Sequence, residues 1–374
     1  MFQNEKLCLM ALLLLLGAGC STSAESEPSS ESAGNAPIPP TNAPTTVAAV
    51  GDIMLGGTAR PELRRYGYDY PFEHVATLLQ DADIAFGNLE GPLTDAGAPE
   101  GDKQYVFRSP PAKVVPALKR AGFDVLSLAN NHSLDYGPHG LADTEAALRA
   151  HGIAAIGAGV DARAARAPVV VEARGKKLGF LAYSLTLPEN FFATDNRPGT
   201  AFGHEDQVRA DVAALKSRVD FVLVSFHWGQ EGKTELRDYQ VRVGHAAIEA
   251  GAHAVIGHHP HILQGVERYR DGVILYSLGN FVFGSYSRSA IRSVVAQLLF
   301  DDRGLREVRL VPINVNNIAF NFQPKLLSPE AAAVSVTHLQ TLSRPLGTEL
   351  ANEDGVAVLR LPVVATPSAH AGER

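Results

Sequence analysis

The chain has 374 residues, of which 45% are hydrophobic, with a formal net charge of −7 and a pI near 6.0. This length and composition are sufficient for the core of one large α/β domain or two ordinary domains. The acidic balance argues against a general nucleic-acid-binding protein, which needs a basic surface, so we expect no nucleic-acid partner.

Residues 1–19 have the pattern of an export signal. Lys6 supplies a positive charge, Leu9 to Leu16 form an apolar core, and small residues precede a cleavage site. The core is too short for a comfortable transmembrane helix. Cys20 follows directly, and the preceding residues resemble a bacterial lipobox, although Gly17 stands where leucine is usual. We expect an exported lipoprotein of the bacterial cell envelope, anchored to a membrane through Cys20. Plain secretion with an incidental Cys20 is the alternative.

The remaining chain divides by composition. Residues 20–45 are rich in Ser, Ala, Glu, Pro and Thr and have little to bury, which predicts a lipidated cysteine followed by a disordered linker. We expect the main domain at 46–325, a helix and a strand that extend it at 326–364, and a tail at 365–374. The only other cysteine, Cys8, lies in the signal, so no disulfide is expected in the mature chain.

Strands and helices are predicted to alternate through the main domain. The apolar runs predict strands at 46–50, 83–86, 123–128, 177–184, 221–225, 254–256 and 273–277. The amphipathic segments predict helices at 72–80, 111–121, 141–151 and 238–250. Residues 187–203 read as a long irregular loop that could cover a site. This order indicates an α/β fold with a sheet built at least partly from βα units, whose ligands bind beyond the carboxyl ends of the strands.

Polar residues follow several of these strands. The residues concerned are Asp52, Asn88, Glu90, Asn131, His132, His227, His259, His261 and Asn280. Each alone has an ordinary explanation, as a turn former, a cap or a core imidazole. Together they are better explained by one site. Carboxylate, amide and imidazole groups suit one or two divalent ions of Mn, Fe or Zn, which can activate water and neutralise phosphoryl charge, while a spare histidine donates a proton.

Six ordered motifs carry a family resemblance. They are Ala49-Val-Gly-Asp-Ile-Met54, Gly87-Asn-Leu-Glu-Gly91, Ala129-Asn-Asn-His132, Phe226-His-Trp-Gly229, Gly257-His-His-Pro-His261 and Tyr276-Ser-Leu-Gly-Asn-Phe281. Together they resemble the CapA/PgsA family of bacterial poly-γ-glutamate capsule proteins, which is related to calcineurin-like metallophosphoesterases. The resemblance covers about Val47 to Val315 and implies a four-layer αββα sandwich with the site at the carboxyl ends of strands.

The resemblance also implies roles for single residues. The implied metal ligands are Asp52, Glu90, Asn131, His227, His259 and His261, with Asn88 as the less favoured counterpart of Glu90, and His132 is the implied general acid. Asn88, Asn130, Arg108, Trp228 and Asn280 are candidates to contact substrate or to support the ligands, and Lys103 is a candidate anion contact. Met54 stands where the phosphoesterase motif D-x-H has histidine, so one metal position is expected to be weaker, differently filled or absent.

Two functions remain open from the sequence. The first is an envelope-tethered protein of capsule synthesis or export, with a metal-dependent, phosphoesterase-like hydrolase centre that acts on a phosphoester or an anionic envelope polymer. Hydrolysis of the γ-amide polymer itself would use the same residues. The alternative is a non-catalytic factor that binds the polymer and assembles with a membrane synthase or export complex. Whether the protein is an enzyme is therefore undecided by sequence.

Overall fold

The computed structural model describes residues 43–100 and 103–362. The expected signal peptide, Cys20, almost all of the linker and the tail lie outside the described residues. No helix of the described ranges is long and apolar enough to cross a membrane.

The larger of two mixed sheets is built around β1, in the spatial order β17-β18-β15-β14-β1-β2-β3-β4. β13 also pairs with β1, and β16 with β15. β2, β3, β4 and β13 run parallel to their neighbours, whereas β14, β15, β17 and β18 form an antiparallel half. Its strands are β1 (Thr45–Met54), β2 (Ile84–Leu89), β3 (Val125–Ser127), β4 (Ala154–Ile156), β13 (Asn280–Phe283), β14 (Arg292–Asp301), β15 (Gly304–Asn314), β16 (Lys325–Leu326), β17 (Ala351–Glu353) and β18 (Val356–Arg360).

The second sheet has the order β11-β12-β10-β9-β7-β6. Its four central strands are parallel and its two edge pairs are antiparallel. The strands are β6 (Val169–Ala173), β7 (Lys176–Ser184), β9 (Phe221–His227), β10 (Ala254–His258), β11 (Val266–Tyr269) and β12 (Gly272–Leu275). A small separate ladder joins β5 (Ala158–Gly159) to β8 (Gly199–Thr200).

Most helices directly follow a strand in the chain. Each is shorter than either large sheet is wide, given a rise of about 1.5 Å per helical residue and a spacing of about 4.8 Å between strands. They are α1 (Arg60–Tyr66), α2 (Thr77–Gln80), α3 (Pro111–Ala121), α4 (Gly137–Ala150), α5 (Ala162–Ala165), α6 (Glu205–Lys216), α7 (Asp238–Glu249), α8 (Asn317–Phe320) and α9 (Pro329–Ser343). Short 3-10 turns occupy Gly57–Ala59, Tyr70–Phe72, Glu189–Phe191 and Arg344–Leu346.

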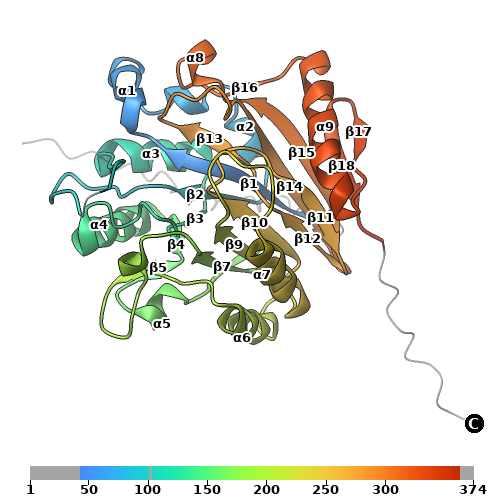
Figure 1. Cartoon of the computed structure of the whole chain (residues 1–374), viewed down its shortest axis with the longest axis horizontal. Helices are drawn as coiled ribbons and strands as arrows, with labels where there is room; N and C mark the ends of the chain where they lie inside the picture. Colours follow the sequence, from blue (N-terminus) through green and yellow to red (C-terminus); the bar gives the residue numbers. More distant parts are fainter. Residues whose placement is uncertain (1–42, 101–102, 363–374) are drawn as a thin grey trace, which may run out of the picture. The chain divides into compact units, whose positions relative to one another are not determined.

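The two sheets pack face to face through one hydrophobic cluster. Phe86 of β2 and Phe180 of β7 stack across this interface with ring centroids 5.8 Å apart. Along β1, Val47 faces this cluster and Val50 faces the opposite side, because successive side chains of a strand alternate. The outer face of the first sheet is covered by α3 and α4, and that of the second sheet by α6 and α7 (Figure 1). Buried apolar area on both faces of both sheets therefore stabilises the fold.

Several predicted elements are confirmed. The helix at 111–121 is α3, bounded by Pro111 and by Gly122, which adopts the left-handed conformation typical of a helix end. The helix predicted at 72–80 is reduced to the single turn α2, preceded by a 3-10 turn that contains Pro71. The loop at 187–203 contains a 3-10 turn and β8, and it buries Phe191.

The antiparallel half of the first sheet was not predicted. β14 pairs along five residues of β1, and β15 continues the sheet. The helix and strand predicted in 326–364 are α9 and β18, and β18 pairs with β15. The predicted α/β class is confirmed, and both large sheets are mixed rather than built from βα units alone.

Candidate metal centre

The parallel strands carry most of the predicted residues to one end of the two sheets. Asp52 of β1 lies in register with Asn88 of β2 on one side and with Asn280 of β13 on the other. His227 and His258, the last residues of β9 and β10, are also paired in register. Asn280 begins a strand instead of following one, which corrects its predicted place. The loop before β13 comes so close to β1 that a Cβ atom on Gly51 would lie 1.8 Å from the Gly279 carbonyl oxygen.

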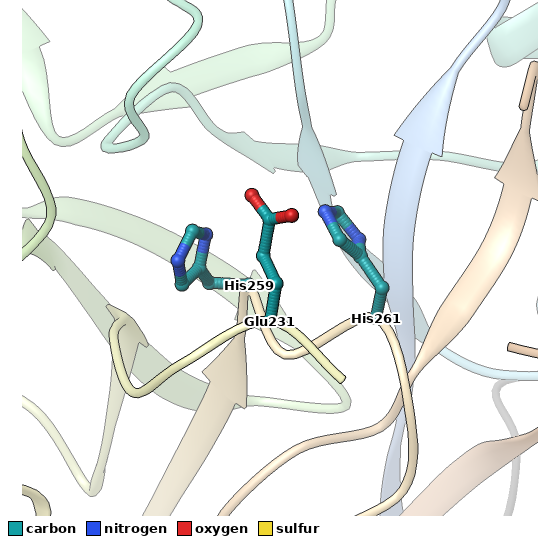
Figure 2. A group of neighbouring side chains, drawn as sticks. All are labelled: Glu231, His259 and His261. Atoms are coloured by element: carbon teal, nitrogen blue, oxygen red, sulfur yellow. The ribbon is translucent and has the colours of Figure 1, made fainter. Parts of the chain in front are cut away.

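Two groups of side chains have the geometry of cation ligands. In the first, Asp52, Glu90 and His227 are all buried and offer ligand atoms within 4.8 Å of one another. In the second, the ligand atoms of Glu231, His259 and His261 also lie within 4.8 Å of one another (Figure 2). The structure thus brings together five of the six residues predicted to bind metal and adds Glu231.

Asn131, the sixth, lies beside His227. Its Oδ1 is 2.8 Å from His227 Nε2, and the same Nε2 is 3.1 Å from His259 Nδ1. An amide oxygen and two ring nitrogens therefore converge on one point. Burial lowers the pKa of His227 well below its usual value and that of His259 to about 3, so both rings are neutral and each has one unprotonated nitrogen that can bind a cation.

Glu90 is the least satisfied polar group of the centre. Both carboxylate oxygens are buried, and neither has a hydrogen-bond partner among the residues described. Burial raises the pKa of Glu90 well above its usual value. Buried carboxylates are normally paired or bound to a metal because an isolated charge is costly to desolvate. A divalent cation beside Glu90 would remove that cost, so the residues present fit such an ion.

His261 currently compensates the carboxylates. Its Nδ1 lies 3.1 Å from Asp52 Oδ2 and 2.9 Å from Asn280 Oδ1, and its Nε2 lies 3.7 Å from Glu90 Oε1. Burial alone would lower the pKa of His261, but Glu90 and Asp52 outweigh it and raise the pKa to about 10. The negative charge that holds a proton on the His261 ring also attracts a divalent cation to the same place.

Two asparagines hold the first carboxylate in place. Asn88 donates its amide hydrogen to Asp52 Oδ1 at 2.8 Å, and Asn130 donates to Asn88 Oδ1 at 3.1 Å. The nitrogen and the oxygen of the Asn88 amide are thus both hydrogen-bonded, whereas the two Glu90 oxygens remain available as cation ligands. Such supporting hydrogen bonds orient metal ligands and tune their basicity.

His132 sits at the edge of the cluster with one nitrogen facing it. Nε2 lies 4.0 Å from Glu90 Oε1, while Nδ1 lies 2.7 Å from Asp135 Oδ2. Burial lowers the pKa of His132, and Asp135 opposes this shift. Asp135 is fully buried and also accepts from Lys103 Nζ at 2.5 Å, so Lys103 holds this pair instead of facing solvent. The sequence analysis missed Asp135, which follows His132 by three residues.

Three nearby residues lie outside the cluster. Trp228 is fully buried, donates to the Tyr276 carbonyl and stacks on Phe226, so it does not contact substrate, and its alternative role of supporting the ligands stays a prediction. Strand alternation explains this, because His227 points inward and its neighbours point to the outer core.

Arg108 packs over the Tyr136 ring at 4.8 Å and lines a different cavity. His258 joins the sheets, with Nε2 donating to the Val50 carbonyl at 3.1 Å.

A cavity of about 360 Å³ opens beside the cluster. Its lining includes His132, His261, Asn280 and Glu231, together with Tyr105 and Tyr286, whose rings are exposed. His261, which lines this cavity, and its neighbour His259 have backbone φ angles of 59° and 93°, values that residues other than glycine rarely adopt. Such strain, roughly 1–3 kcal/mol per residue, is typical of functional sites that the surrounding structure holds in place.

Two mixed sheets that gather carboxylates, an amide and imidazoles at one end define an α/β protein with a candidate divalent-cation centre. The profile of the bacterial capsule synthesis proteins, PGA_cap, matches residues 46–285, and the chain belongs to this family. It is 34% identical over 280 residues to capsule biosynthesis protein CapA of Bacillus anthracis, covering 73% of this chain and 68% of the relative. It is 31% identical over 269 residues to PGA biosynthesis protein CapA of Bacillus subtilis (strain 168), covering 71% and 70%.

Solved structures show a looser likeness. A hypothetical protein from Thermus thermophilus aligns with 17% identity and a TM-score of 0.46, covering 72% of this chain and 99% of that one. A 5'-nucleotidase precursor from the same organism aligns with 16% identity and a TM-score of 0.42, covering 77% of this chain and 55% of that one. At these scores the alignments decide nothing about the site.

Proposed function

We propose that this capsule-family protein contains a metal-dependent hydrolase centre of the phosphoesterase type, and that its two sheets and outer helices form the corresponding four-layer αββα sandwich. The observation that carries the proposal is Glu90, whose two buried oxygens have no hydrogen-bond partner while the neutral ring of His227 offers a ligand atom within 4.8 Å. The residues that would hold the cation are Asp52, Glu90, Asn131, His227, His259 and His261. When bound, a divalent ion such as Mn, Fe or Zn supplies activation of water and neutralisation of developing negative charge.

The chain's own residues divide the remaining work. His132 Nε2 faces the cluster and the 360 Å³ cavity, so it is placed to give a proton to a leaving group there. Asp135 fixes the opposite nitrogen and thereby the orientation of the ring. Phe107 packs against the His132 ring at 4.3 Å and excludes water from that side. The test is hydrolysis of a phosphoester with and without added Mn²⁺ or Zn²⁺, with His132→Asn as the variant.

A second candidate function, binding of an anionic polymer without chemistry, is favoured by another cavity. It has a volume of about 570 Å³ and lies between α1 and the start of α3. Its lining contains the cations Arg60, Arg64, Arg108 and Lys113 and only one acid, Asp95. In the part of the chain that the structure describes, none of these four cations forms an ion pair. A local basic surface of this kind offsets the repulsion between an acidic protein and a polycarboxylate.

We expect the triple variant Arg60→Gln/Arg64→Gln/Lys113→Gln to bind poly-γ-glutamate about ten-fold more weakly at low salt, from roughly 0.5 kcal/mol for each exposed charge pair. The difference should shrink as salt screens the charges. The matched control is Arg163→Gln/Arg218→Gln/Arg303→Gln, which removes three exposed cations elsewhere. Fluorescence anisotropy with a labelled polymer measures both. Equal weakening in the two triple variants would show that net charge, and not this cavity, governs binding.

We further propose that the protein is exported, anchored to a membrane through Cys20, and works beside a membrane synthase or export complex. The signal-like residues 1–19 and the lipobox-like residues before Cys20 support the anchor. The family relationship supports the role in capsule synthesis. The intact mass of the mature protein extracted from membranes checks the anchor, since an unmodified N-terminus would contradict it.

A further inference from the structure

Glu231 lies where the two histidines of the second ligand group point. It belongs to the loop between β9 and α7, and Figure 2 shows its carboxylate between the rings of His259 and His261. A backbone hydrogen bond fixes this placement, because Gly232 N donates to the Pro260 carbonyl at 2.9 Å. Gln264 Nε2 also donates to the Lys233 carbonyl at 2.9 Å. The loop is therefore tied to the histidine segment by two hydrogen bonds just after Glu231.

The Glu231 carboxylate has no hydrogen bond and no ion pair with any residue in the described ranges. It lies within 4.8 Å of a nitrogen of each histidine, without a direct hydrogen bond to either. Two ligands on opposite sides of an ion with bonds of about 2.1 Å are roughly 4.2 Å apart, so one ion could contact all three groups. The 4.8 Å limit is slightly wider than this separation, so small side-chain movements would bring the three groups onto one ion, and no nitrogen of either ring is close enough to Glu231 for a salt bridge.

Charge gives an independent reason for a further carboxylate. Two divalent ions carry four positive charges, and Asp52 and Glu90 supply two negative ones. His259 and His261 alone would bring only neutral nitrogen ligands to a second ion. Met54, which occupies the strand position two residues after Asp52, is buried and offers a thioether, a soft ligand poorly suited to Mn²⁺. Glu231 would supply the missing hard, anionic ligand from the opposite sheet.

We propose that Glu231 is a cation ligand that, with His259 and His261, forms a second metal position beside the one at Asp52, Glu90 and His227. The inference rests on the proposed metal centre and goes beyond it by naming a ligand and an asymmetry. Glu231 is exposed and lines the 360 Å³ cavity, whereas the first group is buried. The second ion is therefore the exchangeable one, and it is the ion that a substrate in the cavity meets.

The test compares Glu231→Gln with Glu235→Gln, which makes the same change at an exposed glutamate of the same loop. Each metal-stripped protein is titrated with Mn²⁺ and followed by elemental analysis after dialysis and by the EPR signal of bound Mn²⁺. We expect about two equivalents in wild type and in Glu235→Gln, and about one in Glu231→Gln. The metal-free proteins should have the same Tm, because Glu231 makes no direct contact that the substitution removes.

The possible results separate this inference from the proposed function. Two equivalents with unchanged affinity in Glu231→Gln would overturn the inference and leave the metal centre standing. Wild-type protein that binds no Mn²⁺, Fe²⁺ or Zn²⁺ would overturn both. Loss of one equivalent in Glu231→Gln alone, with the remaining ion resistant to a chelator, would support the second position and its exposure.

Discussion

The Glu90→Gln variant should lose metal-dependent stabilisation while its metal-free form is at least as stable as metal-free wild type. A ligand present at 100 times its Kd stabilises the folded state by about 2.7 kcal/mol, and a 100-fold loss of affinity reduces this to about 0.4 kcal/mol. The metal-free protein gains because neither buried Glu90 oxygen accepts a hydrogen bond, and an amide is less costly to bury than a carboxylate. Asp52, 3.1 Å from His261 Nδ1, remains as the charge partner of that ring. Thermal unfolding with and without Mn²⁺ measures both changes.

The matched control is Glu145→Gln, at a partly buried glutamate of α4 that belongs to neither ligand group. Burial raises the pKa of Glu145 as well, so the control repeats the substitution at a carboxylate of similar kind. It should leave metal stabilisation unchanged. A Glu90→Gln protein that is stabilised by Mn²⁺ as strongly as wild type would show that Glu90 is not a ligand.

The His132→Asn variant should lose about 10²- to 10⁴-fold in kcat on a phosphoester substrate, the usual contribution of a positioned general acid. Its metal content should match wild type, because His132 lies outside both ligand groups and meets Glu90 only at 4.0 Å. Asp135→Asn should show a smaller loss of kcat with a similar KM, since Asp135 acts by orienting the ring. Steady-state kinetics with full metal loading measures these effects.

His139→Asn is the control, because His139 is an exposed histidine of α4 that pairs with Asp143.

The same variants distinguish the two candidate functions in a strain that lacks the gene. If wild type and His132→Asn restore the polymer equally, and neither hydrolyses a phosphoester, the protein binds polymer and performs no hydrolysis. If only wild type restores it, the chemistry at His132 is needed.

The part of the site carried by local motifs could be predicted from sequence. Asp52, His227 and the pair His259 and His261 lie near the ends of apolar strands or directly follow them, and parallel strands present their carboxyl ends at one edge. Glu90 was favoured over Asn88 through the family resemblance alone, because the hydrogen bonds that engage Asn88 with Asp52 and Asn130 are not contained in the order of residues.

Other features needed the fold. Glu231 becomes a neighbour of His259 only because its loop is bonded to Pro260. The antiparallel strands β14 and β15 were missed. β14 pairs with β1, which lies far away in the chain, and β15 pairs with β14. The burial of Trp228 away from substrate could have been predicted, because strand alternation places it on the opposite side from His227. Asp135 was within reach of sequence reasoning, since it follows His132 by three residues in a polar turn.

The most direct measurement is the metal content of the domain from about Val47 onward, by elemental analysis, for wild type and for the double variant His259→Ala/His261→Ala. The two imidazoles belong to the second ligand group and His259 touches His227, so their removal should abolish the second metal position and weaken the first. We expect about two equivalents of Mn, Fe or Zn in wild type and at most one in the variant, held by Asp52, Glu90 and His227. Wild-type protein that holds no metal, even after reconstitution with each ion, would contradict the metal centre and favour a polymer-binding assembly protein.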